Sequence, residues 1–374
     1  MKIVHIITGL NDGGAENILY KVCKFDNLNN HIVISFVSGG KYSTILKEMG
    51  VTVYSINMKF YSILKFIYLI RLLRNLNPDI VQTWLVHGDF IGGIASRLAG
   101  IKNIVWNVLY SKLDTRIEKI RTIFIIKLLS KLSHIIPKLI IVISKSAYDN
   151  CKNIGYNKNK IILVNSGFDL SYFKISEKQK LDFRNQFNIN HNMPLIGIVA
   201  RYHPIKDHKN LLKALKIIKS KKINFYCVFI GTDMNIENKI LFNDIKNYKL
   251  ENNIKLLGPL NNIPLVMNGL DIKILCSKSE GFSSVIVEAM ACGTPCVVTD
   301  VGDSSFIVGK TGWIVPPSDP AKLATEIQNA IFEIDSDNWE KRCEQARLRV
   351  KKNFGINKMI KSYNLIWSKV YTEN

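Results

Sequence analysis

The chain has 374 residues, of which 47% are hydrophobic, and it carries a formal net charge of +21. This length is too great for one ordinary core and predicts two domains, while the apolar content excludes a disordered protein. The charge predicts an anionic partner, and nucleic acid, an anionic membrane surface and a phosphorylated substrate all fit it.

No secretory signal peptide is recognised, because the first apolar run is short and a polar, Gly-rich loop follows it. No run of about 20 apolar residues predicts a membrane span. The seven cysteines are odd in number and lie mostly in apolar runs, which favours reduced, buried thiols in a cytoplasmic protein over disulfides or a zinc site.

Short β-branched runs alternate with helical patterns through the first half of the chain. A strand at 2–8 leads into a loop where Gly13 and Gly14 open a helix and would let the backbone approach a ligand closely, although a plain strand-to-helix connection stays an alternative. Further strands are predicted at 31–37, 51–56, 79–83, 103–106, 139–143 and 161–164. The alternation predicts right-handed βαβ units and a parallel sheet, with functional residues at the carboxyl ends of its strands.

His87 lies just past the strand predicted at 79–83, at the start of a helix. A side chain there can reach the carboxyl edge of the sheet. A lone histidine is more often structural than functional, so the local pattern by itself leaves both interpretations open.

Two stretches, 58–76 and 112–138, are both basic and apolar. Each is compatible with a helix that packs one face on the sheet and exposes the other to solvent. Each is also compatible with docking on anionic lipid. We favour docking for 112–138, with Arg116, Lys119, Lys127 and Lys131 as contacts, over docking for 58–76.

The second half begins with a polar link at 171–193 and a strand at 195–200, followed by a loop that contains Arg201 and Lys206. A guanidinium and an ammonium group five residues apart on one loop can hold both phosphates of a nucleoside diphosphate, or can be two solvated cations. Further strands are predicted at 225–231, 254–258, 271–276, 296–299 and 312–315. Helices are predicted at 320–334, 339–353 and 356–371.

The stretch 277–299 reads SKSEGFSSVIVEAMACGTPCVVT. It predicts a loop that ends in Ser283 and Ser284, both suited to capping a helix, then a helix at 285–291 and a buried strand. Glu280 and Glu288 would frame a helix N-terminus that can bind an anion. A capping loop followed by an ordinary surface glutamate fits the same spacing.

This stretch resembles the signature of the retaining glycosyltransferase family 4, which has the GT-B fold. The resemblance includes Glu280, seven intervening residues and Glu288, together with the Gly-Phe pair and the Gly-Thr-Pro exit. Other segments resemble the family in the expected order over nearly the whole chain. Among them are 81–100, which is similar to glycosyltransferases of bacterial surface polysaccharides, the turn at 165–169 and the loop at 201–207.

The resemblance implies two facing Rossmann-like α/β/α domains with the active site in the interdomain cleft. Residues 1–170, joined by a crossover helix at 356–374, would bind the acceptor, and residues 171–355 would bind the nucleotide sugar. It implies a retaining transfer of a sugar from a nucleotide diphosphate donor, without metal or other cofactor. The implied catalytic residues are His87, Arg201, Lys206 and Glu280. The implied donor contacts are Gly13, Gly14, Arg201, Lys206, Glu280, Gly281, Phe282, Ser283, Ser284, Val285 and Glu288.

The acceptor implied by the resemblance is a polyprenyl-diphosphate-linked oligosaccharide of O-antigen or capsule assembly. The enzyme would then be peripheral on the inner face of the cytoplasmic membrane. Two alternatives remain: another GT-B enzyme, such as a phosphorylase or sugar epimerase, and a nucleic-acid-binding protein. Charge alone suggests the second, and no aromatic-studded basic motif supports it.

Overall fold

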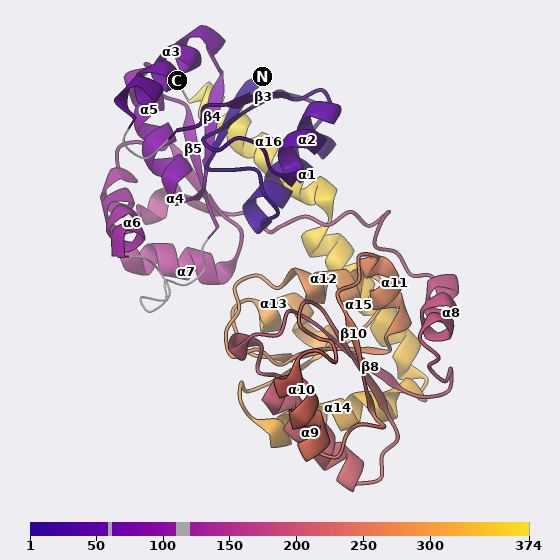
Figure 1. Cartoon of the computed structure of the whole chain (residues 1–374). Helices are drawn as coiled ribbons and strands as arrows, with labels where there is room; N and C mark the ends of the chain where they lie inside the picture. Colours follow the sequence, from indigo (N-terminus) through magenta and orange to yellow (C-terminus); the bar gives the residue numbers. More distant parts are fainter. Residues whose placement is uncertain (59–61, 110–119, 374) are drawn as a thin grey trace. The chain divides into compact units, whose positions relative to one another are not determined.

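The structure is a computed structural model, and it describes residues 1–58, 62–109 and 120–373. The chain forms two compact units (Figure 1). Unit 1 consists of Met1–Gly167 together with Ile356–Asn374, and unit 2 consists of Phe168–Gly355. Each unit contains one parallel β-sheet covered by helices on both faces.

The sheet of unit 1 has the strand order β3-β2-β1-β4-β5-β6-β7 in the described residues, and every pairing in it is parallel. Its strands are β1 (Lys2–Ile7), β2 (Asn30–Ser35), β3 (Thr52–Ser55), β4 (Ile80–Trp84), β5 (Ile104–Val108), β6 (Leu139–Val142) and β7 (Ile161–Leu163). Its helices are α1 (Gly14–Phe25), α2 (Lys41–Glu48), α3 (Ile63–Leu76), α4 (Leu85–His87), η1 (Gly88–Gly92), α5 (Gly93–Leu98), α6 (Ile120–Leu132), α7 (Lys145–Ile154), η2 (Lys158–Lys160) and α16 (Ile356–Thr372).

The last helix of the chain, α16, belongs to unit 1, where it lies among indigo and purple elements (Figure 1). Its apolar residues recur at helical spacing, and Met359, Tyr363, Trp367 and Val370 are buried. They join the core on one face of the sheet together with Trp84 of β4. Burying such an apolar stripe is what holds a helix of this length on a sheet.

The sheet of unit 2 has the order β10-β9-β8-β11-β12-β13 and is also parallel in its described pairings. Its strands are β8 (Leu195–Val199), β9 (Tyr226–Ile230), β10 (Ile254–Gly258), β11 (Ile272–Leu275), β12 (Cys296–Thr299) and β13 (Trp313–Val315). Its helices are α8 (Glu177–Gln186), η3 (Pro204–Lys206), α9 (His208–Ser220), α10 (Lys239–Asn247), α11 (Ile263–Gly269), α12 (Ser284–Ala291), α13 (Ser304–Val308), η4 (Gly309–Thr311), α14 (Pro320–Ile334) and α15 (Asn338–Phe354).

The prediction of a polar link at 171–193 is wrong, because α8 lies within it. This helix has no continuous apolar stripe, so its periodicity is hidden. It is held instead by Phe183, which is fully buried, and by Arg184, which is 1% exposed. The Arg184 guanidinium donates to an Asp271 carboxylate oxygen at 2.6 Å, just before β11.

Every strand predicted from the sequence is present, with bounds that differ by two residues at most. The basic stretches lie only partly within the described residues. In the described residues, the stretch 58–76 forms α3 from Ile63 onward, and the stretch 112–138 forms α6 from Ile120 onward. Across the described residues, no helix combines the length and the apolar character that crossing a bilayer requires.

Candidate functional site

Two loops of unit 2 meet at the carboxyl ends of the neighbouring strands β8 and β11. The backbone N–H of Lys278 donates to the Ile205 carbonyl at 2.8 Å, and the Cys276 thiol contacts the Lys206 carbonyl at 3.1 Å. These contacts bring together two motifs that the sequence placed far apart. They hold the loop that begins at Arg201 against the loop that carries Glu280.

Lys206 and Glu280 form an ion pair at this edge. Lys206 Nζ lies 2.6 Å from Glu280 Oε1, and the side chains are only 22% and 12% exposed. The Ser277 hydroxyl donates to the same oxygen at 2.6 Å, a contact that sequence reasoning missed. Arg201 is exposed on the same loop as Lys206. The edge therefore carries a neutralised pair beside a further cation.

Glycine is required at two positions that shape these loops. Gly302 has φ +57°, and a Cβ atom there would lie 2.4 Å from the Gly281 carbonyl oxygen. The neighbouring Asp303 N–H donates to that same carbonyl at 3.0 Å. A Cβ atom on Gly231, at the end of β9, would lie 2.0 Å from the Ala200 carbonyl oxygen. Backbone therefore packs directly on backbone next to Glu280 and next to Arg201.

Helix α12 begins immediately after the Glu280 loop, with Ser283 at its N-cap position. Ser283 is buried, yet its side chain makes no capping hydrogen bond, so the expected side-chain cap is wrong. Ser284 is exposed, and both Val285 and Glu288 are partly buried. Phe282 stacks on Phe168 at a ring distance of 6.2 Å. A helix end without a side-chain cap has N–H groups that an anion can accept hydrogen bonds from.

Lys273 and His208 are buried titratable groups near this edge that sequence reasoning did not single out. Lys273 is 1% exposed on β11, and burial lowers its pKa to about 8. His208 is 4% exposed at the start of α9, and burial, with the nearby Lys206 charge, lowers its pKa to about 4. A lysine inside the apolar run of a strand was the available signal for Lys273.

The predicted residues of unit 1 lie at the carboxyl ends of β1 and β4. Gly13 is the N-cap of α1, and a Cβ atom there would lie 2.3 Å from a Glu16 carboxylate oxygen. A Cβ atom on Gly14 would meet no atom within 4 Å. His87 ends the short helix that follows β4, and its half-burial lowers its pKa, so the imidazole is neutral near pH 7. The space around Gly14 and the neutral imidazole of His87 are features of this edge that a ligand could use.

A chain of buried hydrogen bonds crosses the sheet of unit 1. The Trp84 indole N–H donates to His5 Nδ1 at 3.2 Å, so His5 carries its proton on Nε2 and donates to His31 Nδ1 at 2.9 Å. His31 Nε2–H then donates to the Asp26 carboxylate at 3.0 Å. Burial by itself would raise the pKa of Asp26, but these hydrogen bonds hold it below the ordinary value.

The same chain anchors α16. Asn364 donates to Asp26 at 3.1 Å, and the Trp367 indole donates to Gln82 at 2.6 Å. The ligand atoms of His5, Cys23 and His31 lie within 4.8 Å of one another, a group that could hold a metal ion. The facing nitrogens of the two histidines are already used in the hydrogen-bonded chain, and burial raises the pKa of Cys23. The arrangement therefore fits a structural polar core better than a metal site.

The two basic stretches expose different surfaces. On α6, Ile125, Ile126 and Leu129 are buried in the core, while Phe124, Lys127 and Lys131 are exposed. Arg116 and Lys119 lie outside the described residues.

On α3, by contrast, four large apolar side chains face solvent beside three basic residues. Ile63 is 74% exposed and Leu64 is 80% exposed. The exposed apolar side chains are Ile63, Leu64, Ile67 and Tyr68, and the exposed basic ones are Lys65, Arg71 and Arg74. The helix has no acidic residue. Within the described residues, α3 therefore exposes four large apolar side chains of the kind that an interfacial helix needs, whereas α6 exposes Phe124.

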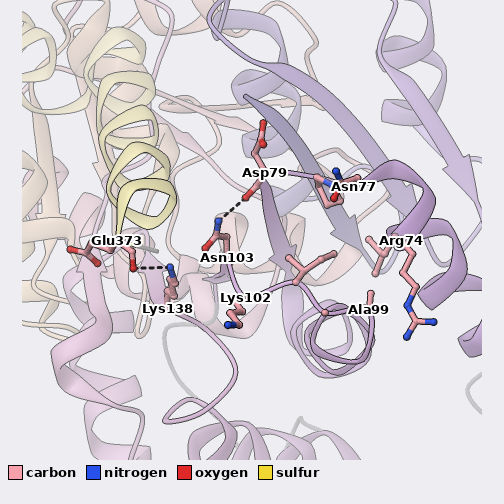
Figure 2. A pocket seen from close by; sticks show the side chains of 12 residues that line it. Arg74, Asn77, Asp79, Ala99, Lys102, Asn103, Lys138 and Glu373 are labelled. Carbon is pink, nitrogen blue, oxygen red and sulfur yellow. Dashed lines mark hydrogen bonds between the residues drawn. The ribbon is translucent and has the colours of Figure 1, made fainter.

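A separate hollow of about 660 Å³ lies at the opposite edge of the unit 1 sheet (Figure 2). It is lined by residues that precede the strands, including Asp79, Asn103 and Lys138. Asn103 donates to the Asp79 carbonyl at 3.1 Å, and Lys138 donates to the Glu373 carbonyl at 3.4 Å (Figure 2). Ligands of doubly wound sheets bind at the carboxyl ends of the strands, so this hollow is not the candidate site.

A model of a known protein family matches most of unit 2. Residues 179–347 match the family model described as glycosyl transferases group 1. That segment contains the Arg201–Lys206 loop, the Lys206–Glu280 pair and α12.

Curated relatives match most of the chain. It is 29% identical over 282 residues, 72% of this chain and 73% of the relative, to N,N'-diacetylbacillosaminyl-diphospho-undecaprenol alpha-1,3-N-acetylgalactosaminyltransferase of Campylobacter jejuni. It is 26% identical over 318 residues, 83% of this chain and 80% of the relative, to the capsular polysaccharide biosynthesis glycosyltransferase CapM of Staphylococcus aureus.

The fold also matches solved structures. Anabaena Alr3699/HepE in complex with UDP has a TM-score of 0.86 and 22% identity, and the match covers 99% of this chain and all of that chain. This likeness and the two parallel-sheet units confirm the predicted GT-B fold.

Proposed function

We propose that the protein, a glycosyltransferase whose residues 179–347 match the glycosyl transferases group 1 family model, moves a sugar from a nucleotide diphosphate sugar to a lipid-linked surface glycan. The observation that carries the proposal is the Lys206–Glu280 pair beside the N-terminus of α12. In this proposal the cation binds phosphate and the carboxylate binds sugar hydroxyls at one site. The diphospho-undecaprenol acceptor in the name of the Campylobacter relative supports the acceptor class.

The cations would act on the leaving group. As the bond between the sugar and the diphosphate breaks, negative charge grows on the phosphate oxygens, and fixed positive groups stabilise it. We assign this role to Arg201, Lys206 and the N–H groups at the start of α12, without a metal ion. An ammonium group has several N–H donors, so Lys206 can keep Glu280 and still bind a phosphate oxygen.

The carboxylates would hold the rest of the donor. Lys206 and Ser277 both contact Glu280 Oε1, so Oε2 is the oxygen that we assign to the sugar hydroxyls. We assign Glu288 to the nucleotide ribose, while Gly13 and Gly14 would let the unit 1 backbone approach the donor. His87 would position the sugar or the incoming hydroxyl with a neutral imidazole. With no carboxylate assigned as a nucleophile, we expect attack from the same face, assisted by the leaving phosphate and retaining the anomeric configuration.

A lipid-linked acceptor requires the enzyme to work at a membrane surface. We place it on the inner face of the cytoplasmic membrane, and we assign apolar insertion to α3, because Ile63 and Leu64 are exposed there beside cations. Lys127 and Lys131 of α6 would add electrostatic attraction to anionic lipid. This changes the expected order of the two basic stretches, since Ile125, Ile126 and Leu129 of α6 are buried and Phe124 is the large apolar side chain that the described part of this helix exposes.

The proposed reaction is tested by a donor screen followed by a transfer assay. Nucleoside diphosphates and their sugar derivatives are screened for protection against thermal unfolding, since a ligand that binds only the folded state raises the melting temperature. The protecting donor is then incubated with a polyprenyl-diphosphate-linked acceptor, and the product and the released nucleoside diphosphate are measured.

Release of nucleoside diphosphate together with a longer glycan supports the proposal. Conversion of the donor without an acceptor would indicate an epimerase, and a requirement for inorganic phosphate would indicate a phosphorylase. Protection by nucleic acid instead, with a steep dependence on salt, would overturn the enzyme assignment.

The membrane assignment is tested by sedimentation with vesicles that contain phosphatidylglycerol. Ile63→Ser with Leu64→Ser removes apolar insertion and lowers binding at low and high salt alike, because salt does not screen apolar contacts. Lys127→Gln with Lys131→Gln is the matched control, and it lowers binding only at low salt. Wild-type protein that stays in the supernatant at low salt would rule out docking.

A further inference from the structure

The turn that carries His87 follows an unusual backbone path. Leu85, the first residue after β4, has φ +67°, a conformation that a leucine adopts at a cost of about 1–3 kcal/mol. Gly88, the next residue after His87, packs closely against β1, and a Cβ atom on it would lie 2.9 Å from the Ile6 carbonyl oxygen. Gly88–Gly92 then forms a π-helical turn, which is rare and is frequently found at functional sites.

Asp89 lies in this π-helical turn and is 1% exposed. The Thr83 hydroxyl of β4 donates to its Oδ1 at 2.5 Å, and the backbone N–H of Asn107 on β5 also donates to its carboxyl group. Oδ2 has no hydrogen-bond partner within residues 1–58, 62–109 and 120–373. The carboxyl group thus fastens the turn to two neighbouring strands at their carboxyl ends.

A buried carboxyl group in this position destabilises the fold relative to an apolar side chain of similar size. Burial raises the pKa of Asp89 well above its ordinary value, against the hydrogen bonds from Thr83 and Asn107. An unpartnered buried oxygen destabilises a fold, and an apolar side chain would avoid that loss. What the carboxyl group supplies in return is a fixed link between β4, β5 and the turn.

We propose that Asp89 is a positioning residue for sugar transfer, whose carboxyl group holds the Leu85–His87 turn on β4 and β5 and so fixes the imidazole of His87 at the carboxyl edge of the sheet. This inference rests on the role proposed for His87. The hydrogen bonds that Asp89 accepts need an oxygen at Oδ1 rather than a negative charge. An asparagine at the same position therefore keeps the function, and an alanine loses it.

The test compares Asp89→Ala, Asp89→Asn and Thr83→Val, with kcat, KM for the donor and affinity for free nucleoside diphosphate measured for each. A catalytic group displaced by about 1 Å can lose about 10²-fold in rate. We therefore expect Asp89→Ala to lower kcat by about 10²-fold, and Asp89→Asn to stay within about threefold of wild type. Thr83→Val, which keeps the volume and removes one hydrogen bond, gives an intermediate loss even if Asp89→Ala does not fold. Affinity for the nucleoside diphosphate, bound by unit 2, is unchanged in all three.

A second readout does not depend on activity. The ring resonance of His87 is identified in histidine-labelled protein by its loss in His87→Gln, and its titration is followed by NMR. Half-burial keeps the pKa of His87 below its ordinary value. We expect the midpoint to rise towards that of a free histidine in Asp89→Ala and in Thr83→Val, and to stay unchanged in Asp89→Asn.

The outcomes separate this inference from the proposed function. A wild-type protein that transfers no sugar would refute the proposed function alone, because the His87 titration still reports whether Asp89 holds the turn. An unchanged titration midpoint in folded Asp89→Ala and Thr83→Val overturns the positioning role. A wild-type kcat in those two variants also overturns the positioning role. So does a loss of kcat in Asp89→Asn that equals the loss in Asp89→Ala.

Discussion

The contact between Lys206 and Glu280 predicts how Glu280→Gln changes both the stability of unit 2 and its affinity for ligands. Glu280→Gln keeps an oxygen that can accept from Lys206 and Ser277 but removes the charge. A hydrogen bond to a charged group contributes about 1.5–3 kcal/mol, and both side chains are largely shielded from water. Since the amide retains part of the contact, we expect a loss of about 1–2 kcal/mol in the free energy of unfolding of unit 2. For a unit of this size that lowers the melting temperature by about 2–8 °C.

Glu280→Gln should raise the affinity for free nucleoside diphosphate although it lowers the stability of unit 2. Without the Glu280 charge, the Lys206 cation is no longer neutralised, so free nucleoside diphosphate binds about threefold to tenfold more tightly, a gain of about 0.7–1.4 kcal/mol. The nucleotide sugar loses its hydroxyl contact with the carboxylate, so its advantage over the free nucleoside diphosphate shrinks or disappears. Titration calorimetry with both ligands on wild type and variant measures both changes.

Three results would refute this reasoning. If Glu280→Gln weakens both ligands equally, Glu280 contacts the nucleotide rather than the sugar. If neither affinity nor the melting temperature changes, the ion pair does not form in solution. A double-mutant cycle with Lys206→Gln gives the coupling energy directly, and a coupling near zero contradicts the 2.6 Å contact.

Arg201→Ala and Lys206→Ala should each lower turnover by about 10²–10³-fold, because each removes a fixed donor to the developing phosphate charge, and wild-type rates at subsaturating donor would contradict this role. Glu288→Gln should weaken nucleotide sugar and free nucleoside diphosphate alike, by about 1.5–3 kcal/mol in calorimetry, if it binds ribose. Turnover should persist after chelation of divalent ions and dialysis, and dependence on added Mg²⁺ would overturn the metal-free scheme. Burial lowers the pKa of His208 to about 4, so as pH falls the unfolded chain takes up a proton before the folded chain does. Wild type therefore loses about 2 kcal/mol of its free energy of unfolding through this group between about pH 7 and pH 5. His208→Phe should lose less of its free energy of unfolding over the same range, as measured by urea unfolding. Gly302→Ala, with φ +57° and no room for a Cβ atom, should lower both the melting temperature and turnover, and unchanged values of both would contradict the backbone packing described at this loop.

The local pattern of the sequence predicted most of the fold. Strands such as β8 and β12 are short β-branched runs between helical patterns, and this contrast in period is present within a few residues. The exception, α8, shows why the rule works elsewhere. Its stability depends on Arg184 meeting Asp271, 87 residues away, and local periodicity contains no trace of that contact.

The motif around Glu280 and Glu288 likewise pointed to the family and to one end of a helix from the sequence alone. The sequence could not show that Lys206 and Glu280 are in contact, because they are 74 residues apart and meet only when β8 and β11 pair. Nor could it show that the Ser283 side chain does not cap α12. Side-chain partners at a site are set by the distances that the folded sheet imposes.

Burial decided between interpretations that the sequence had left open for the basic stretches. The stretches at α3 and α6 have the same kind of composition, and only packing decides that Ile125 and Leu129 enter the core while Ile63 and Leu64 stay exposed. Asp89 follows a strand, where the sequence predicts functional residues, but the positioning role that we propose for it rests on its burial and on its hydrogen bond from Thr83. Apart from α8, the sequence alone determined which elements form, because local propensity and period act over a few residues. The tertiary structure decided which faces are buried and which charges are paired, because those depend on residues brought together from distant parts of the chain.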